Sequence, residues 1–236
     1  MTKSQIVALG GSLLKNREGH NLDDWFSGLI STCKQLQENG KSIGFVVGGG
    51  SPARYGINLA KNSVSEPHRL DLIGISATKL NATTIQQVLI SNGIDVANSI
   101  PNTIEEAVKL LARHQFVCMG GTAPGHTTDT VATRLAIASG ASSCTVATDV
   151  PFVYDKDPNK FDDAVALEQL NLARLAEICG VGKEFIPGQS AVIDPIAIGE
   201  AISHSIEMNV LDGKKIELLE SALFGREFEG SKITVE

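Results

Sequence analysis

Three β-prone segments of this chain run directly into glycines, and no other feature limits its fold as strongly. Segment 5–9 is followed by GGS at 10–12, segment 42–47 by GGGS at 48–51, and segment 116–119 by GGT at 120–122. Helical patterns alternate with these strands, which is typical of a mainly parallel sheet covered by helices on both faces. We therefore predict an α/β fold, a three-layer sandwich with bare glycine backbone at the carboxyl edge, where open α/β sheets bind ligands.

The other elements follow from periodicity and from end signals. Asn21 is expected to cap a helix over 22–36, Asp194 to cap another that begins at Pro195, and Gly140 to close a helix in a left-handed conformation. Further helices are predicted from Pro52 onward and over 70–92, 103–113, 170–179 and 216–224. Further strands are predicted over 94–98, 144–148, 206–211 and 232–235, with 151–161 a loop of some extended character.

The composition fits a single globular domain spanning 1–236. A formal charge of −7 argues against a nucleic-acid partner, which needs a basic face, but it leaves room for a nucleotide site. The four cysteines are scattered singly, which favours buried thiols in a reducing compartment over disulfides or zinc. Neither a leader pattern nor an apolar run of membrane-spanning length occurs, so we expect a cytoplasmic protein without a membrane partner.

The third glycine junction has the pattern of an anion site. Its strand, glycine loop and helix N-terminus would point unpaired amides and the positive end of a helix dipole at one place. Gly120, Gly125, His126 and Thr127 nearly spell a Walker A loop, but His126 stands where the lysine belongs, and no Lys or Arg occurs from 116 to 133. A true P-loop is therefore disfavoured, and a plain strand-to-helix turn explains this stretch as well as an anion site does.

Six segments, taken in order over nearly the whole chain, resemble the amino-acid kinase superfamily and within it the archaeal-type UMP kinases. They are VALGGSLL, VVGGGSPARYG, DLIGISATKLNA, MGGTAPGHTTDTVA, ATDVPFVYDKDP and VIDPIAI. The resemblance implies the amino-acid kinase fold and an enzyme of pyrimidine nucleotide biosynthesis. It would transfer a phosphoryl group from ATP, bound with Mg²⁺, to UMP, and would assemble as a homohexamer.

The resemblance also implies roles for individual residues. A lobe over about 1–141 would hold UMP, and a lobe over about 142–236 would hold ATP. ATP would contact Gly11, Ser12, Gly50, Arg54, Thr148, Asp149, Tyr154 and Asp157. UMP would contact Gly49, Asp71, Thr122, Ala123, Pro124, Gly125, His126, Thr127 and Thr128, with Asp71 on the ribose hydroxyls. No metal site formed by the protein alone is expected.

The expected catalytic residues are Arg54, Asp129 and Lys15, and they follow partly from a departure. Many members of the family carry a lysine where this chain has Ala8, so another cation must replace it; the candidates, in order, are Arg54, Lys15 and Lys79. Asp129 is expected to orient a cation or magnesium, although the helix dipole alone also explains an acidic residue in that first turn.

A second departure leaves readings open. Pro151 and Phe152 replace an Asp and a Gly of the family's ATP loop, and Asp149 could either lie near magnesium or cap a turn. Another small-phosphate kinase, of the isopentenyl-phosphate type, remains an alternative, although the GGG loop lacks the histidine of those relatives. Ala8 and Pro151 would also suit a non-catalytic nucleotide sensor or storage subunit. The apolar face of 22–36 could serve either the core or a dimer interface.

Overall fold

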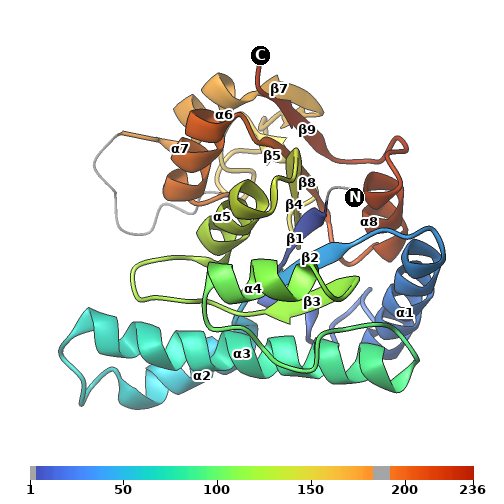
Figure 1. Cartoon of the computed structure of the whole chain (residues 1–236). Helices are drawn as coiled ribbons and strands as arrows, with labels where there is room; N and C mark the ends of the chain where they lie inside the picture. The colour runs from blue at the N-terminus through green and yellow to red at the C-terminus, as the bar shows by residue number, and fades with distance from the viewer. Residues whose placement is uncertain (1–3, 183–191) are drawn as a thin grey trace.

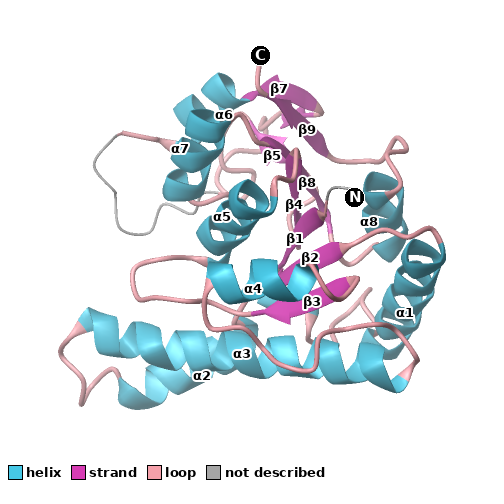
Figure 2. Ribbon diagram, viewed as in Figure 1, coloured by secondary structure: helices cyan, strands magenta, loops and turns pink. Residues whose placement is uncertain are grey.

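The computed structural model describes residues 4–182 and 192–236. Its main sheet has seven strands in the order β3-β2-β1-β4-β8-β9-β7, which run as one band through the molecule in Figure 2. In chain order these strands are β1 (Gln5–Leu9), β2 (Ile43–Val47), β3 (Phe116–Met119), β4 (Ser143–Thr148), β7 (Gln169–Asn171), β8 (Glu207–Asp212) and β9 (Ser231–Thr234). Two short strands, β5 (Val153–Tyr154) and β6 (Ala166–Leu167), pair separately as an antiparallel ribbon.

The helices form a layer on each face of the sheet, as Figure 1 shows. They are α1 (Leu22–Glu38), α2 (Gly50–Ala60), α3 (Pro67–Ser91), α4 (Ile104–Leu111), α5 (Thr128–Ser139), α6 (Leu172–Cys179), α7 (Pro195–His204) and α8 (Ile216–Leu223), with a 3-10 turn, η1, at Gly11–Leu13. The predicted three-layer α/β architecture is confirmed. No helix in the described part of the chain is long and apolar enough to cross a membrane.

Strand alternation divides the core into two clusters, one on each face. Ile6 and Ala8 of β1 face a cluster closed by α4, α5, α6 and α7, whereas Val7 and Leu9 face one closed by α1, α3 and α8. Successive side chains of a strand point to opposite faces, so a strand that is apolar throughout must be covered on both sides. β1 from Ile6 to Leu9 is fully apolar and buried, as this requires.

Helix α1 illustrates how the sequence sets an element and its packing. Asn21 caps it by accepting hydrogen bonds from the backbone N–H groups of Asp23 and Asp24, as predicted. Its apolar face, which includes Trp25 and Leu29, is buried under the sheet, so the open choice between core and interface is settled in favour of the core.

The four cysteines are free and buried. Burial raises the pKa of the Cys118 thiol to about 12.

Two element predictions are wrong. Residues 94–98 do not form a strand: Val96 makes only an isolated bridge to Phe116, because the backbone pairing along the free edge of β3 is limited, among the described residues, to two hydrogen bonds, from Phe116 N–H to Asp95 and from Ala97 N–H to Phe116. The predicted helix over 170–179 begins later, because Leu170 and Asn171 pair with β9 as part of the edge strand β7. Asn171 then caps α6 by accepting a hydrogen bond from the backbone N–H of Arg174.

The strand order brings the carboxyl ends that matter to one edge. Strands β3, β2, β1, β4 and β8 are all parallel, whereas β9 runs antiparallel to β8. The residues that follow these five parallel strands are Gly120, Gly48, Gly10, Asp149 and Gly213. The prediction of a mainly parallel sheet with glycines at its carboxyl edge is therefore confirmed.

Candidate functional site

A cavity of about 430 Å³ lies at this carboxyl edge. We call the two loops that form most of its wall, residues 10–12 and 48–51, the glycine edge. The lining residues are Gly10, Gly11, Ser12, Lys15, Arg17, Gly48, Gly49, Gly50, Ser51, Arg54, Thr128 and Asp149. Of the predicted site residues, the cavity therefore brings together Gly11, Ser12, Lys15, Gly49, Gly50, Arg54, Thr128 and Asp149.

The two loops of the glycine edge interlock so closely that no side chain fits between them. A Cβ atom on Gly11 would lie 2.3 Å from the backbone nitrogen of Gly50 and 2.4 Å from the carbonyl oxygen of Gly48. Gly50 also has a φ of 54°, a left-handed conformation that favours glycine. Backbone groups thus form this wall, and bare amides at the start of α2 suit an anion.

Asn81 of α3 holds the glycine edge from behind. Its buried side-chain amide donates to the carbonyl oxygens of Gly48, at 2.7 Å, and Gly49, at 3.1 Å. Moving the loop away from α3 would leave this buried amide without acceptors, which costs free energy. The two hydrogen bonds therefore hold the loop against the helix. Asn81 was not among the predicted site residues, although it lies in the quoted motif DLIGISATKLNA.

Charge in the cavity is mainly positive. Lys15, Arg17 and Arg54 line it, and Asp149 is the one carboxylate among the lining residues. Arg17 donates from Nη1 to Oδ2 of Asp149 at 3.2 Å. Burial opposes ionisation of Asp149, but the hydrogen bond from Arg17 and others outweigh burial and lower the pKa of this carboxyl below its ordinary value. Asp149 is therefore part of an ion pair, a reading that neither sequence alternative included.

The set of cations expected to replace the family lysine needs one correction. Ala8 is buried in the core, and Arg54 and Lys15 do line the cavity. Lys79 does not: its Nζ donates to Oδ1 of Asn102 at 2.6 Å, because α3 carries this side chain toward the 100–103 loop. The third cation that lines the cavity is Arg17. Sequence reasoning missed it because it lies in a loop without a family motif.

Next to the glycine edge lies the loop of residues 122–128, which we call the threonine loop. Thr128, the first residue of α5, belongs to this loop and also lines the cavity. Asp71 of α3 accepts a hydrogen bond from the backbone N–H of Gly125 at 2.8 Å. The predicted residue Asp71 and the predicted residues 122–127 are thus brought together, beside the cavity but outside its lining.

The other end of the threonine loop is held by Asp194, which was predicted only as a helix cap. One oxygen of Asp194 accepts hydrogen bonds from the hydroxyls of Thr127, at 2.7 Å, and Thr130, at 2.8 Å. Its other oxygen caps α7 by accepting from the backbone N–H of Ile196 at 2.9 Å. One carboxylate therefore joins the N-termini of α5 and α7, which a linear sequence pattern does not reveal.

His126 contacts a charged neighbour that sequence reasoning also missed. Its ring nitrogens lie 3.2 and 3.3 Å from Nη1 of Arg134, and the guanidinium of Arg134 in turn pairs with Glu200 at 2.6 Å. Arg134 lies two turns into α5, on the side that faces α7. His126 is thus held beside the Arg134–Glu200 pair, and its proposed contact with UMP stays a prediction.

Asp129 lies behind the site and does not line the cavity. The residue as a whole is only partly buried. Loss of water around its carboxyl, together with the nearby Asp194 charge, nevertheless raises its pKa to about 6. The thiol of Cys144 is buried and forms a hydrogen bond with the backbone of Ala8. Burial, and to a lesser degree Asp129, raise the pKa of this thiol. Asp129 thus lies near Ala8, where the family resemblance would place a lysine, and a hydrogen bond with the backbone of Asp194 offsets only part of the effect of its burial.

The remaining predicted residues lie around the β5–β6 ribbon and are not brought into the cavity. Thr148 lies next to the lining residue Asp149, and the Thr148 hydroxyl is 3.4 Å from the Asp149 carboxylate. Tyr154 packs its ring edge-on against Phe152. Asp157 accepts from the backbone N–H of Asn159 at 3.0 Å, which with its other partners lowers the pKa of this carboxyl. No group of three metal-ligating side chains comes together within residues 4–182 and 192–236.

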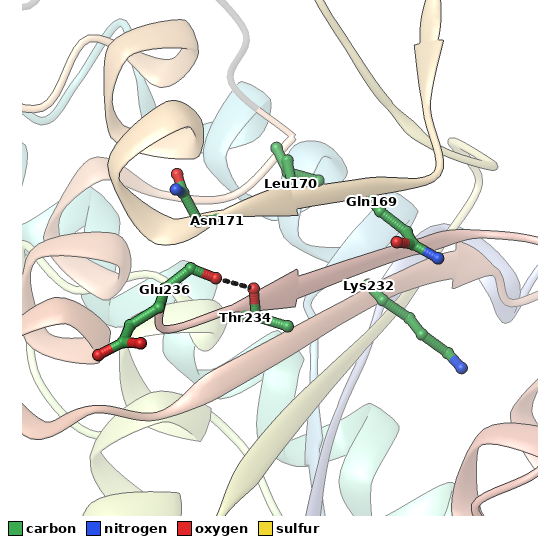
Figure 3. Close-up of a pocket in the computed structure, with 6 residues that line it drawn as sticks. All are labelled: Gln169, Leu170, Asn171, Lys232, Thr234 and Glu236. Carbon is green, nitrogen blue, oxygen red and sulfur yellow. Dashed lines mark hydrogen bonds between the residues drawn. The ribbon is translucent and has the colours of Figure 1, made fainter.

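A second cavity, also of about 430 Å³, lies at the far edge of the sheet, where β7 pairs with β9. Figure 3 shows its lining residues, with the Thr234 hydroxyl donating to the backbone oxygen of Glu236 and the Lys232 side chain extending away from that pair. Lys232 is its only cation, and no glycine loop contributes amides. With one lysine, one carboxylate and no glycine loop among its lining residues, this cavity resembles a phosphate site less than the cavity at the glycine edge does.

Comparison with known proteins agrees with this arrangement. The sequence model of the amino acid kinase family matches residues 3–212. A uridylate kinase from Methanococcus maripaludis strain C6 is 36% identical over 92% of this chain and 93% of its own length, and one from Thermoplasma volcanium is 37% identical over 91% and 95%.

Solved structures give the same result. The crystal structure of uridylate kinase from Archaeoglobus fulgidus superposes with a TM-score of 0.80 at 32% identity, covering 98% of this chain and all of the other. A UMP kinase from Bacillus anthracis, at 21% identity, shares the fold with a TM-score of 0.78. The chain belongs to the amino acid kinase family, and its relatives there include archaeal uridylate kinases.

Proposed function

We propose that this chain is a UMP kinase, which transfers a phosphoryl group from ATP to UMP and so yields UDP and ADP. One observation carries the proposal: Thr128 belongs both to the cavity at the glycine edge and to the threonine loop. Two places suited to anions would therefore meet at the N-terminus of α5. A reaction that joins two phosphate-bearing molecules needs such a meeting point.

The glycine edge suits the phosphates of ATP. Phosphoryl transfer asks for in-line positioning and for dispersed positive charge rather than covalent chemistry by the protein. Backbone amides of Gly11 and Gly50 would contact the phosphates, while Lys15 and Arg54 would balance their charge. Thr148, Asp149, Tyr154 and Asp157 would border the rest of the nucleotide. Magnesium would enter with ATP, and Asp149 is the lining carboxylate able to contact it; the ion would neutralise part of the phosphate charge.

The threonine loop suits UMP. Residues 122–128 offer hydroxyls and amides to a phosphate, and Gly49 lies where the two nucleotides would face each other. Asp71, held against the loop through Gly125, presents a carboxylate that suits ribose hydroxyls and would repel a phosphate. Residues 1–141 would then hold mainly UMP and residues 142–236 mainly ATP, apart from the glycine edge. Asp129 would orient a cation near the reacting phosphates.

We further propose that the chain works in the cytoplasm as a homohexamer. Four large apolar side chains are exposed on the α2–α3 pair, which runs along one side of the molecule in Figure 1: Tyr55, Leu59, Leu72 and Leu80. Exposed apolar side chains on one helix pair are a feature of surfaces that another copy covers. Light scattering of the purified chain tests this, and a monomer mass would contradict it.

A coupled assay of ADP release tests the activity. ATP is supplied with UMP, CMP, AMP or isopentenyl phosphate as acceptor, at matched concentrations. Rapid turnover with UMP and little with isopentenyl phosphate is expected. Turnover only with isopentenyl phosphate would favour the other small-phosphate kinase, and tight binding of nucleotides without turnover would favour the sensor.

A further inference from the structure

The strongest feature without a role so far is the ion pair between Arg17 and Asp149. It joins a loop that follows η1 to the residue after β4, and both members line the cavity at the glycine edge. Both side chains keep roughly a third of their surface exposed, so the pair is accessible to a ligand. Neither helix capping nor core packing explains its position.

The loop that carries Arg17 is held rigidly. His20 is buried, and its Nε2 lies 2.7 Å from the carbonyl oxygen of Leu13. The backbones of Arg17 and His20 exchange hydrogen bonds in both directions, at 2.9 and 3.2 Å. Asn16 accepts a hydrogen bond from the backbone N–H of Leu22 at 2.7 Å, which fixes the loop to the start of α1. Arg17 is thus presented at the cavity by a fixed backbone, while its long side chain can turn.

The guanidinium of Arg17 is poorly satisfied where it rests. Nη1 donates to Asp149, but Nε and Nη2 are shut off from solvent and have no hydrogen-bond partner among the described residues. Such a group carries the desolvation cost of its unmade hydrogen bonds. A carboxylate or a phosphate can each engage two nitrogens of the planar arginine fork, but Asp149 engages only Nη1 here, so a phosphate could satisfy the nitrogens that it leaves unpaired.

We propose that Arg17 binds the phosphate chain of ATP, and that Asp149 holds it ready while no nucleotide is bound. The inference rests on the proposed function only in taking ATP as the anion. On binding, the side chain would turn from Asp149 to the phosphates, which leaves the carboxylate free. Arg17 would then join Lys15 and Arg54 as a third cation at the site of a chain that has Ala8 in place of a lysine.

The test measures ATP binding by calorimetry without UMP, and separately the KM values for ATP and UMP. Arg17→Gln is expected to raise the Kd for ATP at least about tenfold, as loss of a charged hydrogen-bond donor does, and to leave the KM for UMP within about twofold. Arg17→Lys, which keeps the charge, should recover part of the loss. Arg174→Gln, which removes a surface arginine paired with Glu177, is the matched control and should change neither value.

A double-mutant cycle distinguishes direct binding from action through Asp149. If Arg17 contacts phosphate, Arg17→Gln should weaken ATP binding by at least as large a factor in the Asp149→Asn background, because the carboxylate no longer competes with ATP for Arg17. An effect that disappears in that background would overturn the proposal, and so would an unchanged Kd for ATP in Arg17→Gln. Thermal unfolding of each variant confirms folding, and Arg17→Lys serves if Arg17→Gln does not fold. Absence of UMP turnover in the unsubstituted chain would contradict the proposed function but would not alter these binding results.

Discussion

The glycine edge and the threonine loop lie side by side at one edge of the sheet, yet they are built differently. In the glycine edge, two backbone loops touch so closely that side chains are excluded, and Asn81 holds both carbonyls from behind. In the threonine loop the backbone is open, and side chains from other elements hold it, namely Asp71 and Asp194. The first construction gives a fixed cradle of amides for any phosphate chain, whereas the second gives a loop shaped by individual side chains, which suits recognition of one acceptor.

The largest effect should come from a methyl group placed in the glycine edge. Gly11→Ala would put a Cβ 2.3 Å from the nitrogen of Gly50, so the two loops must separate. We expect a loss of turnover of at least about 100-fold, as misplacement by an ångström can cause, together with weaker ATP binding. Gly199→Ala is the control, because a Cβ there meets nothing within 4 Å and the helix α7 gains stability. Full activity in Gly11→Ala would show that the edge is not a rigid cradle.

The next effect concerns Asp129, which lies behind the cavity next to Thr128, the residue shared by the two regions. Asp129→Asn is expected to lower kcat by about 100-fold, the order of magnitude seen when one group that stabilises transition-state charge is removed from an active site. Full turnover in this variant would remove the proposed role.

Asp129 should also give a signature in stability. Its pKa is about 6 in the fold against an ordinary value of 3.8, so the folded chain binds this proton more tightly than the unfolded chain does. The favourable contribution is complete below the ordinary value and is lost as pH rises through about 6. Asp129→Asn should therefore be more stable than the unsubstituted chain at pH 7, and this advantage should shrink toward pH 4. Thermal unfolding at both pH values measures it; an advantage independent of pH would contradict the assignment.

Loss of Asp71 should have a smaller effect, and one that is confined to the threonine loop. Asp71→Ala removes the acceptor for the Gly125 N–H and the proposed ribose contact. We expect the KM for UMP to rise by roughly 10- to 100-fold, since hydrogen bonds to charged groups are worth that much, with little change in the KM for ATP. Equal changes in both values would mean that Asp71 supports the whole edge rather than the threonine loop.

The smallest effect should come from a glycine of the threonine loop itself. Gly125 has a φ of 80°, but a Cβ there would meet nothing within 4 Å. Gly125→Ala should therefore cost only about 1 kcal/mol of backbone strain, which a several-fold higher KM for UMP would report. A loss as large as that of Gly11→Ala would remove the contrast between a packed edge and an open loop.

Local signals in the sequence predicted most of the fold. The glycine junctions, the Asn21 and Asp194 caps and the left-handed Gly140 were all confirmed, because each depends on neighbouring residues. The failures depend on pairing between distant segments: Leu170 joined β9 instead of starting a helix, and Val96 made one bridge without a strand. Periodicity does not contain information about such partners.

The site shows the same limit. Residues within the quoted motifs, such as Gly11 and Arg54, do line the cavity. Arg17 has no motif of its own, and only the fold shows that it faces Asp149. Asp194 was visible as a cap but not as a partner of Thr127, because the two are brought together by helix packing. The roles of these residues in binding remain predictions.

A crystal structure of the chain with UMP and a non-hydrolysable ATP analogue tests the central claim most directly. The account predicts the triphosphate against the amides of Gly11 and Gly50, and the UMP phosphate against residues 122–128, with Thr128 between the two. A triphosphate lying on the threonine loop, with UMP in the glycine edge, would contradict it.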